Sequence, residues 1–453
     1  ASLLPSCGAV SEFSFGHCLA RMAAMKLAAV SCLSLVPLAR GGYMDLVSLK
    51  DRHPDAVCLD GTPSGYHLHL AEDTDVGKNT WIVYLESGGW CWDRESCDER
   101  CVKRPELCTS KVWPETLEVG GLLSRTSKDL HISLRTANKV FIRYCTSDAH
   151  MGDATAFGGL QFRGQKVIQA VLSDLVVEHG LGKGGASERD LLLFGGGSAG
   201  SRGAMVHLDY VLPMLGSAAA GVDVVGFLDS PLWLDMPPFN TSDPERWNLA
   251  EQTATIHSFA QVSHLGPDCA AAYPDKQWKC MLGEYRLPFL KTRYVVAAAL
   301  HDGFGLWALV GGSPSEWSTA ELEYVEAFAN RTALVLEHIA SNGHAVIGMA
   351  CYTHSESLSD DGFFKKHTGG GKSLNYALHH LLGLAEGANG AISVIKYIDD
   401  CRTLGCGKGC VPPETQEEEE EEESDEPHEL DATPAMTISM STMLLAVVSA
   451  LAI

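Results

Sequence analysis

The feature that most constrains the fold is a series of short, almost continuously apolar runs. They lie at residues 81–85, 140–144, 190–194, 222–228, 294–298 and 345–349. Strands buried on both faces of a parallel sheet have this character, because neither face meets water. Helix-like stretches separate several of the runs, at residues 165–178, 203–215 and 319–341. The alternation predicts an α/β fold: an open, mostly parallel sheet with helices on both faces.

The chain divides into four parts by composition. Residues 1–40 contain an apolar run that is too short for a bilayer and resembles a signal peptide behind an upstream segment; a buried N-terminal helix is the alternative. Residues 41–410 are predicted to form the single folded domain. Residues 411–435 include seven consecutive glutamates, which cannot form a core, and predict a disordered acidic tether. Residues 436–453 are apolar and uncharged, so we expect a membrane anchor or an anchor signal.

Cysteine number points to an oxidising compartment. Twelve of the fifteen cysteines lie between Cys58 and Cys410, and an even dozen fits six disulfides. The cysteine-dense stretch 91–108 is predicted to be a disulfide-tied excursion near the top of the sheet. Asn240 and Asn330 begin glycosylation sequons, which a secretory route permits. We therefore expect a protein that is secreted or held at the extracellular face of a membrane.

A zinc site is the alternative reading of some of these cysteines. Cys97 and Cys101, and likewise Cys406 and Cys410, are separated by three residues, a spacing that zinc sites use. Neither pair has a histidine at matching spacing, and so disulfides are the preferred interpretation.

Charge argues against nucleic acid as a partner. The formal net charge is −23, of which twelve acidic residues and no Lys or Arg fall in residues 411–453. The remainder is still acidic and shows no basic patch, and an acidic surface repels phosphates.

A glycine-rich turn follows the third apolar run. Gly196, Ser198 and Gly200 form the pattern G-x-S-x-G between this run and a helix-like stretch. In a nucleophile elbow, a sharp strand-to-helix turn needs residues without Cβ bulk beside a strained serine. The turn presents the hydroxyl at a helix N-terminus, where backbone N–H groups can stabilise an oxyanion.

The same residues allow two other interpretations. Gly195, Gly197 and Gly200 match the dinucleotide fingerprint G-x-G-x-x-G. That fingerprint belongs in the first βα turn with an acid about 20 residues later, whereas Asp229 comes later and at least two strands precede the turn. An ordinary structural turn is the third possibility. The local motif alone does not choose among the three.

Residues that could complete a catalytic triad follow in the order that an α/β-hydrolase needs. Asp302 and His354 each lie just beyond a predicted strand, after Ser198. Histidine can take the serine proton, and a buried carboxylate fixes its tautomer. Turnover is then expected to fall below about pH 6, as His354 protonates. Upstream, residues 87–90 follow a predicted strand, where their N–H groups could complete an oxyanion hole.

Several segments, in order over residues 50–410, together resemble the pectin acetylesterase and Notum carboxylesterase family. They are residues 85–91, 141–148, 197–200, 228–235, the region of Asp302, and 351–354. The resemblance implies a secreted serine esterase of α/β-hydrolase fold, without metal or organic cofactor. It also implies that Ser198 is the nucleophile, His354 the general base and acid, and Asp302 the orienting residue. The implied oxyanion hole consists of the N–H groups of Gly89, Trp90 and Ala199.

The chain departs from the family pattern at three places. Ser87 stands where glycine is usual, Ser201 replaces the glycine that commonly follows the elbow, and the glutamine after the catalytic acid is missing. None of these changes removes a triad residue.

The function that follows from the resemblance is removal of O-linked acyl groups through an acyl-enzyme. We expect a monomer that takes acetyl groups from an extracellular polysaccharide such as pectin, although an acidic protein disfavours a polyanion whose ester groups do not mask its charge. A Notum-like deacylase of a lipid-modified protein is one alternative. A catalytically silent binding protein on a hydrolase scaffold is the other.

Overall fold

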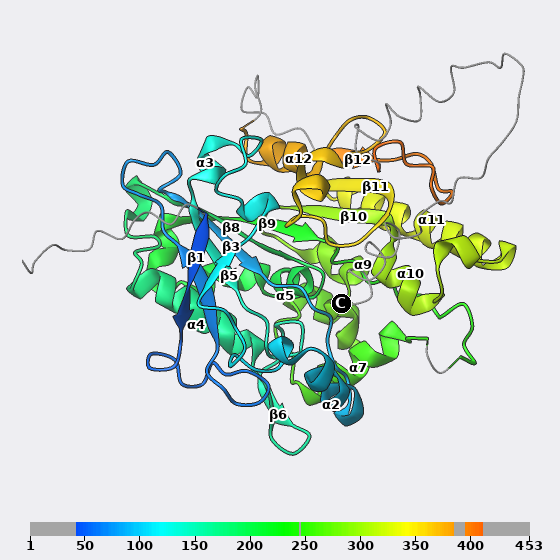
Figure 1. Cartoon of the computed structure of the whole chain (residues 1–453), viewed down its shortest axis with the longest axis horizontal. Helices are drawn as coiled ribbons and strands as arrows, with labels where there is room; N and C mark the ends of the chain where they lie inside the picture. Colours follow the sequence, from blue (N-terminus) through cyan, green and yellow to red (C-terminus); the bar gives the residue numbers. More distant parts are fainter. Residues whose placement is uncertain (1–41, 244–245, 385–394, 411–453) are drawn as a thin grey trace, which may run out of the picture. The chain divides into compact units, whose positions relative to one another are not determined.

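The computed structural model describes residues 42–243, 246–384 and 395–410, which lie within one compact unit. In this part of the chain the main sheet has ten strands, in the order β12-β11-β10-β9-β8-β3-β5-β2-β1-β4 (Figure 1). Their bounds are β1 Tyr43–Ser48, β2 Gly65–His69, β3 Thr80–Leu85, β4 Thr116–Glu118, β5 Asn138–Ile142, β8 Asp190–Gly197, β9 Val222–Asp229, β10 Tyr294–Asp302, β11 Ala345–Thr353 and β12 Lys396–Ile398. A separate ribbon pairs β6 Ala154–Ala156 with β7 Leu160–Phe162.

The sheet is parallel from β12 to β5, which confirms the predicted fold class. All six apolar runs became strands of this parallel part. The antiparallel end, made by β2, β1 and β4, was not predicted. Within β1 only Met44 is buried, so this edge region lacks the continuous apolar run that marks a central strand.

Helices cover both faces of the sheet. They are α2 Arg94–Lys103, α3 Ile132–Arg135, α4 Gly164–Val177, α5 Ala199–His207, α6 Val211–Met214, α7 Leu249–Phe259, α8 Pro267–Ala272, α9 Gly283–Arg286, α10 Gly303–Leu309, α11 Thr319–Ser341 and α12 Leu374–Leu381. Side chains alternate between faces along a strand. Val83 therefore packs in the core that α4, α5 and α11 share, and Ile82 packs in the core of α3 and α12. Figure 1 shows α12 on one side of the strands and α4 and α5 on the other.

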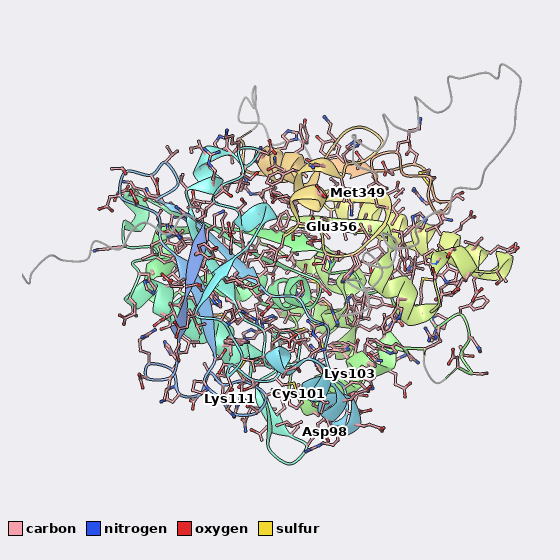
Figure 2. All side chains as sticks on the ribbon, in the orientation of Figure 1. Asp98, Cys101, Lys103, Lys111, Met349 and Glu356 are labelled. Carbon is pink, nitrogen blue, oxygen red and sulfur yellow. A yellow bond between two sulfur atoms is a disulfide. The ribbon has the colours of Figure 1, made fainter. Side chains whose placement is uncertain are left out.

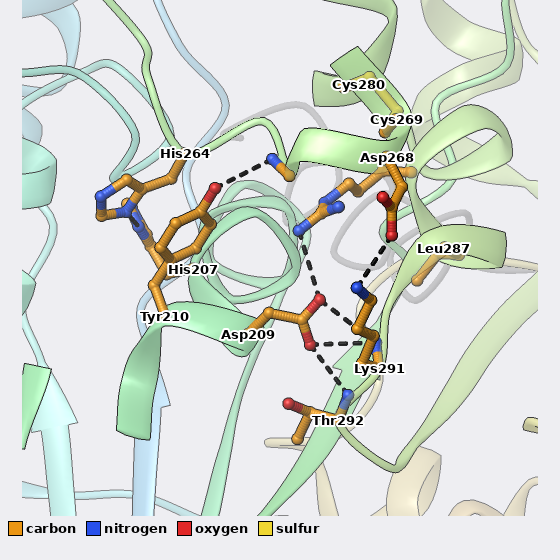
Figure 3. Close-up of polar contacts among 12 residues, drawn as sticks. His207, Asp209, Tyr210, His264, Asp268, Cys269, Cys280, Leu287, Lys291 and Thr292 are labelled. Atoms are coloured by element: carbon orange, nitrogen blue, oxygen red, sulfur yellow. Dashed lines mark hydrogen bonds and ion pairs between the residues drawn. A yellow bond between two sulfur atoms is a disulfide. The ribbon is translucent and has the colours of Figure 1, made fainter. Parts of the chain in front are cut away.

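The helix predicted over residues 203–215 is broken in the structure. It begins earlier, at Ala199, and α5 ends at His207, with α6 following after one tighter turn. Asp209 lies in that turn and accepts hydrogen bonds from the backbone N–H groups of Lys291 and Thr292, at 3.1 and 2.9 Å (Figure 3). A contact with the segment just before β10 thus fixes the far end of α5, the helix that follows Ser198.

The structure confirms the disulfide prediction. Among the described residues, all twelve cysteines are paired: Cys58–Cys145, Cys91–Cys97, Cys101–Cys108, Cys269–Cys280, Cys351–Cys410 and Cys401–Cys406. Cys97 and Cys101 both lie on α2, whose Cys101 is marked in Figure 2, and their bonds tie this excursion to the loops around it. The four cysteines of the zinc alternative are therefore not available as thiolate ligands.

We predict that these twelve cysteines do not react with an alkylating reagent in the denatured, unreduced protein. After reduction, mass spectrometry should find all twelve alkylated, because each sulfur is held in a disulfide. Alkylation of peptides from residues 42–410 before reduction would contradict the pairing.

Other predictions concern the surface and the ends of the chain. The sequon residues Asn240 and Asn330 are both exposed. None of the helices in the described ranges is long and apolar enough to cross a membrane. The predicted signal peptide, acidic tether and C-terminal apolar segment lie outside the described residues.

Candidate active site

Three side chains, each at the C-terminal end of a different strand, meet at the carboxyl edge of the parallel part of the sheet. Ser198 directly follows β8, Asp302 ends β10, and His354 follows β11. Because neighbouring parallel strands end at the same edge, residues far apart in sequence come together there. The structure therefore brings together the three residues of the predicted triad.

Ser198 occupies a strained position at the turn into α5. Its φ is 51° and its ψ is −119°, a conformation that residues with a Cβ rarely adopt. A Cβ added at Gly200 would lie 2.0 Å from the carbonyl oxygen of Leu85, and one at Gly196 would lie 2.8 Å from the same oxygen. The end of β3 packs so closely on the turn that both positions need glycine. This is the geometry of a nucleophile elbow.

A continuous hydrogen-bonded chain links the three side chains. Ser198 Oγ lies 2.7 Å from His354 Nε2, and His354 Nδ1 lies 2.7 Å from Asp302 Oδ2. The other carboxylate oxygen of Asp302 accepts from the N–H of Gly305 at 2.8 Å and caps α10. When Nδ1 donates to the carboxylate, Nε2 is left as the acceptor for the Ser198 hydroxyl proton.

The electrostatic environment favours the protonated form of His354. Burial alone would lower its pKa, but the carboxylate of Asp302 and, more weakly, those of Asp229 and Glu356 outweigh it and raise the pKa above its ordinary value of 6.5. Asp302 can thus stabilise the imidazolium that forms when the histidine takes a proton.

This pKa changes the expected pH dependence. A general base must be neutral, so turnover falls when pH drops through the pKa of His354. Since that pKa is raised, we expect the acid limb of kcat/KM to have its midpoint above pH 6.5, higher than the sequence alone suggested. Glu356, in the loop after β11 (Figure 2), offers a test: Glu356→Gln should move the midpoint to lower pH. A midpoint unchanged by this substitution would contradict the assignment.

The loop after β3 supplies candidate oxyanion-hole donors. The carbonyl of Gly89 accepts from the Tyr144 hydroxyl at 2.8 Å, and that of Gly88 accepts from Arg100. The φ of Gly88 is 147° and that of Gly89 is 66°, so the two glycines turn the backbone sharply. Within the described ranges, no hydrogen bond occupies the N–H groups of Gly89, Trp90 or Ala199. These three donors are therefore free to bind a developing oxyanion.

Sequence reasoning did not find the serine contacts that support the triad. The hydroxyl of Ser87 donates to the carbonyl of Gly197 at 2.9 Å and lies 3.2 Å from Ser355 Oγ. The N–H of Ser355 in turn donates to Ser230 Oγ at 3.1 Å. Ser87, a departure from the family pattern, thus ties the oxyanion loop to the elbow. Ser201 is buried with no hydrogen-bond partner in the described part of the chain, and nothing in the structure explains it.

A small apolar cavity adjoins the triad. Its volume is about 20 Å³, and Asp302, Ser230 and several apolar side chains line it, among them Leu232, Trp233 and Phe328. The ring of Phe304 contacts both Trp233 and His354, with ring centroids 5.2 and 5.3 Å apart. Over the described residues, no group of three or more His, Cys, Asp or Glu is arranged to hold a metal ion.

A family model described as pectinacetylesterase matches residues 39–411, which is most of the chain. The chain belongs to the pectinacetylesterase family. A zebrafish relative, palmitoleoyl-protein carboxylesterase notum1a, is 30% identical over 54% of this chain and 48% of its own length. A Drosophila relative, palmitoleoyl-protein carboxylesterase NOTUM, is 32% identical over 67% of this chain and 44% of its own. The chain thus spans about half the length of the curated relatives it matches.

A solved structure agrees with the fold of this pectinacetylesterase-family chain. The structure of the Wnt deacylase Notum from Drosophila superposes with a TM-score of 0.70 at 25% sequence identity. The match covers 81% of this chain and 99% of that one.

Proposed function

We propose that this protein is a serine carboxylesterase that removes O-linked acyl groups. The observation that carries the proposal is the hydrogen-bonded chain from Ser198 through His354 to Asp302, at a strained elbow beside free N–H donors. Membership of the pectinacetylesterase family supports the same conclusion.

In this mechanism Ser198 Oγ attacks the ester carbonyl carbon while His354 Nε2 takes the hydroxyl proton. The N–H groups of Gly89, Trp90 and Ala199 bind the oxyanion of the tetrahedral intermediate. Protonated His354, stabilised by Asp302, then gives its proton to the leaving alcohol, which departs and leaves an acyl-enzyme. Water, deprotonated by His354, attacks the acyl-enzyme and releases the carboxylic acid and free Ser198.

We propose an acetyl group on an extracellular polysaccharide such as pectin as the substrate. A cavity of about 20 Å³ beside the triad has room for about one water-sized group, far less than a long acyl chain occupies, and so favours a short acyl group. A second candidate is deacylation of a lipid-modified protein, which the names of the Notum relatives favour. A long acyl chain needs a deep apolar pocket, however.

A fluorophosphonate probe tests the proposed function. Wild-type protein should be labelled, and correctly folded Ser198→Ala should not, because the probe reacts with an activated serine.

A series of acetate, butyrate and octanoate esters then tests which acyl group is removed, and we expect acetate to be preferred. Absence of both labelling and turnover in folded wild type would favour a catalytically silent binding protein. Preference for octanoate would favour the lipid-modified substrate.

The proposed location is the secretory pathway, because six disulfides need an oxidising compartment to form and persist. We also propose that residues 436–453 attach the protein to a membrane and that the protein is a monomer.

A truncation tests the membrane attachment. A chain ended near residue 412 should keep its esterase rate and move from the membrane fraction to the medium. Loss of folding or rate on this truncation would contradict the proposed domain boundary.

A further inference from the structure

Arg202 is a buried guanidinium close to the nucleophile with few polar partners. It lies on α5, four residues after Ser198, and its exposed fraction is 0%. Nη2 donates to the carbonyl oxygen of Met281 at 3.3 Å. In the described part of the chain, Nε and Nη1 have no hydrogen-bond partner. Burying a guanidinium without such partners is costly, so other contacts must hold it there.

Two indole rings provide those contacts. Arg202 Cζ lies 4.0 Å from the ring centroid of Trp90 and 3.7 Å from that of Trp233. The two indoles also meet edge to face, with centroids 4.9 Å apart. A desolvated cation over an aromatic face is attracted by the quadrupole of the ring. The guanidinium therefore fixes the positions of both rings.

Both rings belong to the candidate active site. The backbone N–H of Trp90 has no hydrogen-bond partner in the described residues and is one of the proposed oxyanion-hole donors. Trp233 lines the small cavity that reaches Asp302, and its ring contacts Phe304, whose ring in turn contacts His354. Trp233 thus lines the cavity, and Arg202 packs against its indole.

We propose that Arg202 is a specificity-determining residue: by clamping Trp90 and Trp233, it keeps the cavity beside the triad small and restricts the esterase to short acyl groups. The inference rests on the proposed esterase function. A longer acyl chain in this cavity must displace the Trp233 indole, and the guanidinium opposes that displacement. Interiors are close-packed, so removing the Arg202 side chain gives the indole space to move.

The test is the ratio of kcat/KM for p-nitrophenyl octanoate to that for the acetate. We expect Arg202→Ala to raise this ratio at least about 10-fold, since each methylene accommodated in an apolar pocket is worth roughly 10-fold or more. The gain should come mainly from a lower KM for octanoate. Trp233→Leu, which shortens the cavity wall itself, should raise the ratio in the same direction and serves if Arg202→Ala does not fold.

Arg286→Ala is the matched control. Arg286 is also a buried arginine, 1% exposed, with Nε and Nη2 lacking a hydrogen-bond partner in the described residues. It lies near Asp209 beyond the other end of α5, at 3.7 Å. Its substitution should lower stability without changing the acyl-length ratio.

Two results would overturn the inference. One is an unchanged ratio in folded, probe-labelled Arg202→Ala, or in Trp233→Leu if the first variant does not fold. The other is an equal rise in Arg286→Ala, which would indicate general loosening. Failure of the proposed function looks different, since wild type would then show neither labelling nor turnover of any ester.

Discussion

Ser198→Ala and His354→Ala are each expected to lower kcat/KM for acetate esters by about 10³-fold or more. The reason is the continuous chain of 2.7 Å contacts from Ser198 Oγ through the imidazole to Asp302. Triad residues act as a unit, so the double variant should lose little more than either single one. Initial rates on p-nitrophenyl acetate, corrected for protein that retains its native circular dichroism, measure the effect.

Asp302→Asn should lower the rate strongly, because the amide cannot stabilise the imidazolium or fix its tautomer as the carboxylate does. A small residual rate should remain, because Ser198 and His354 are still present. Near-full rate in this variant would move the role of the acid elsewhere. Asp229 would then be the first candidate, since its charge contributes to the raised pKa of His354. Asp360 is a weaker candidate, because its carboxylate accepts from the N–H of Gly121 at 2.7 Å.

Gly200→Ala is expected to destabilise the protein by at least about 3 kcal/mol and to abolish probe labelling of any folded fraction. The added Cβ would lie 2.0 Å from the carbonyl oxygen of Leu85, a backbone atom of β3 in the middle of the sheet. Neither the strand nor the elbow can move without disturbing the other. Urea unfolding and fluorophosphonate labelling measure the two effects.

Gly370→Ala is the control for this substitution. Gly370 is exposed, and a Cβ there would come no closer than 3.8 Å to the Thr368 side chain. Its stability and labelling should match wild type. Normal stability and labelling of Gly200→Ala would show that the close approach of β3 to the elbow is not needed.

The sequence by itself predicted six of the seven strands in the parallel part of the sheet, all but β12, and named the candidate triad residues. Strands buried on both faces need continuous apolar runs. The positions of such runs along the sequence were therefore enough to find β3, β5, β8, β9, β10 and β11. Ser198, Asp302 and His354 each directly end or follow such a strand, and parallel strands end at a common edge. Local pattern and chain order made them candidates, and the resemblance to the pectin acetylesterase and Notum family implied their roles.

Only the tertiary structure decided which cysteines pair, how the antiparallel end of the sheet is built, and what surrounds the triad. Pairing depends on distances between residues as far apart as Cys58 and Cys145, which spacing does not give. Arg202 looks like an ordinary polar residue in the sequence, and Ser87 stands out there only as a departure from the family pattern. Their roles arise because Ser87 meets the elbow and Arg202 is enclosed by two indoles from other segments. Such contacts depend on side-chain packing between distant segments, for which a single sequence carries no local signal.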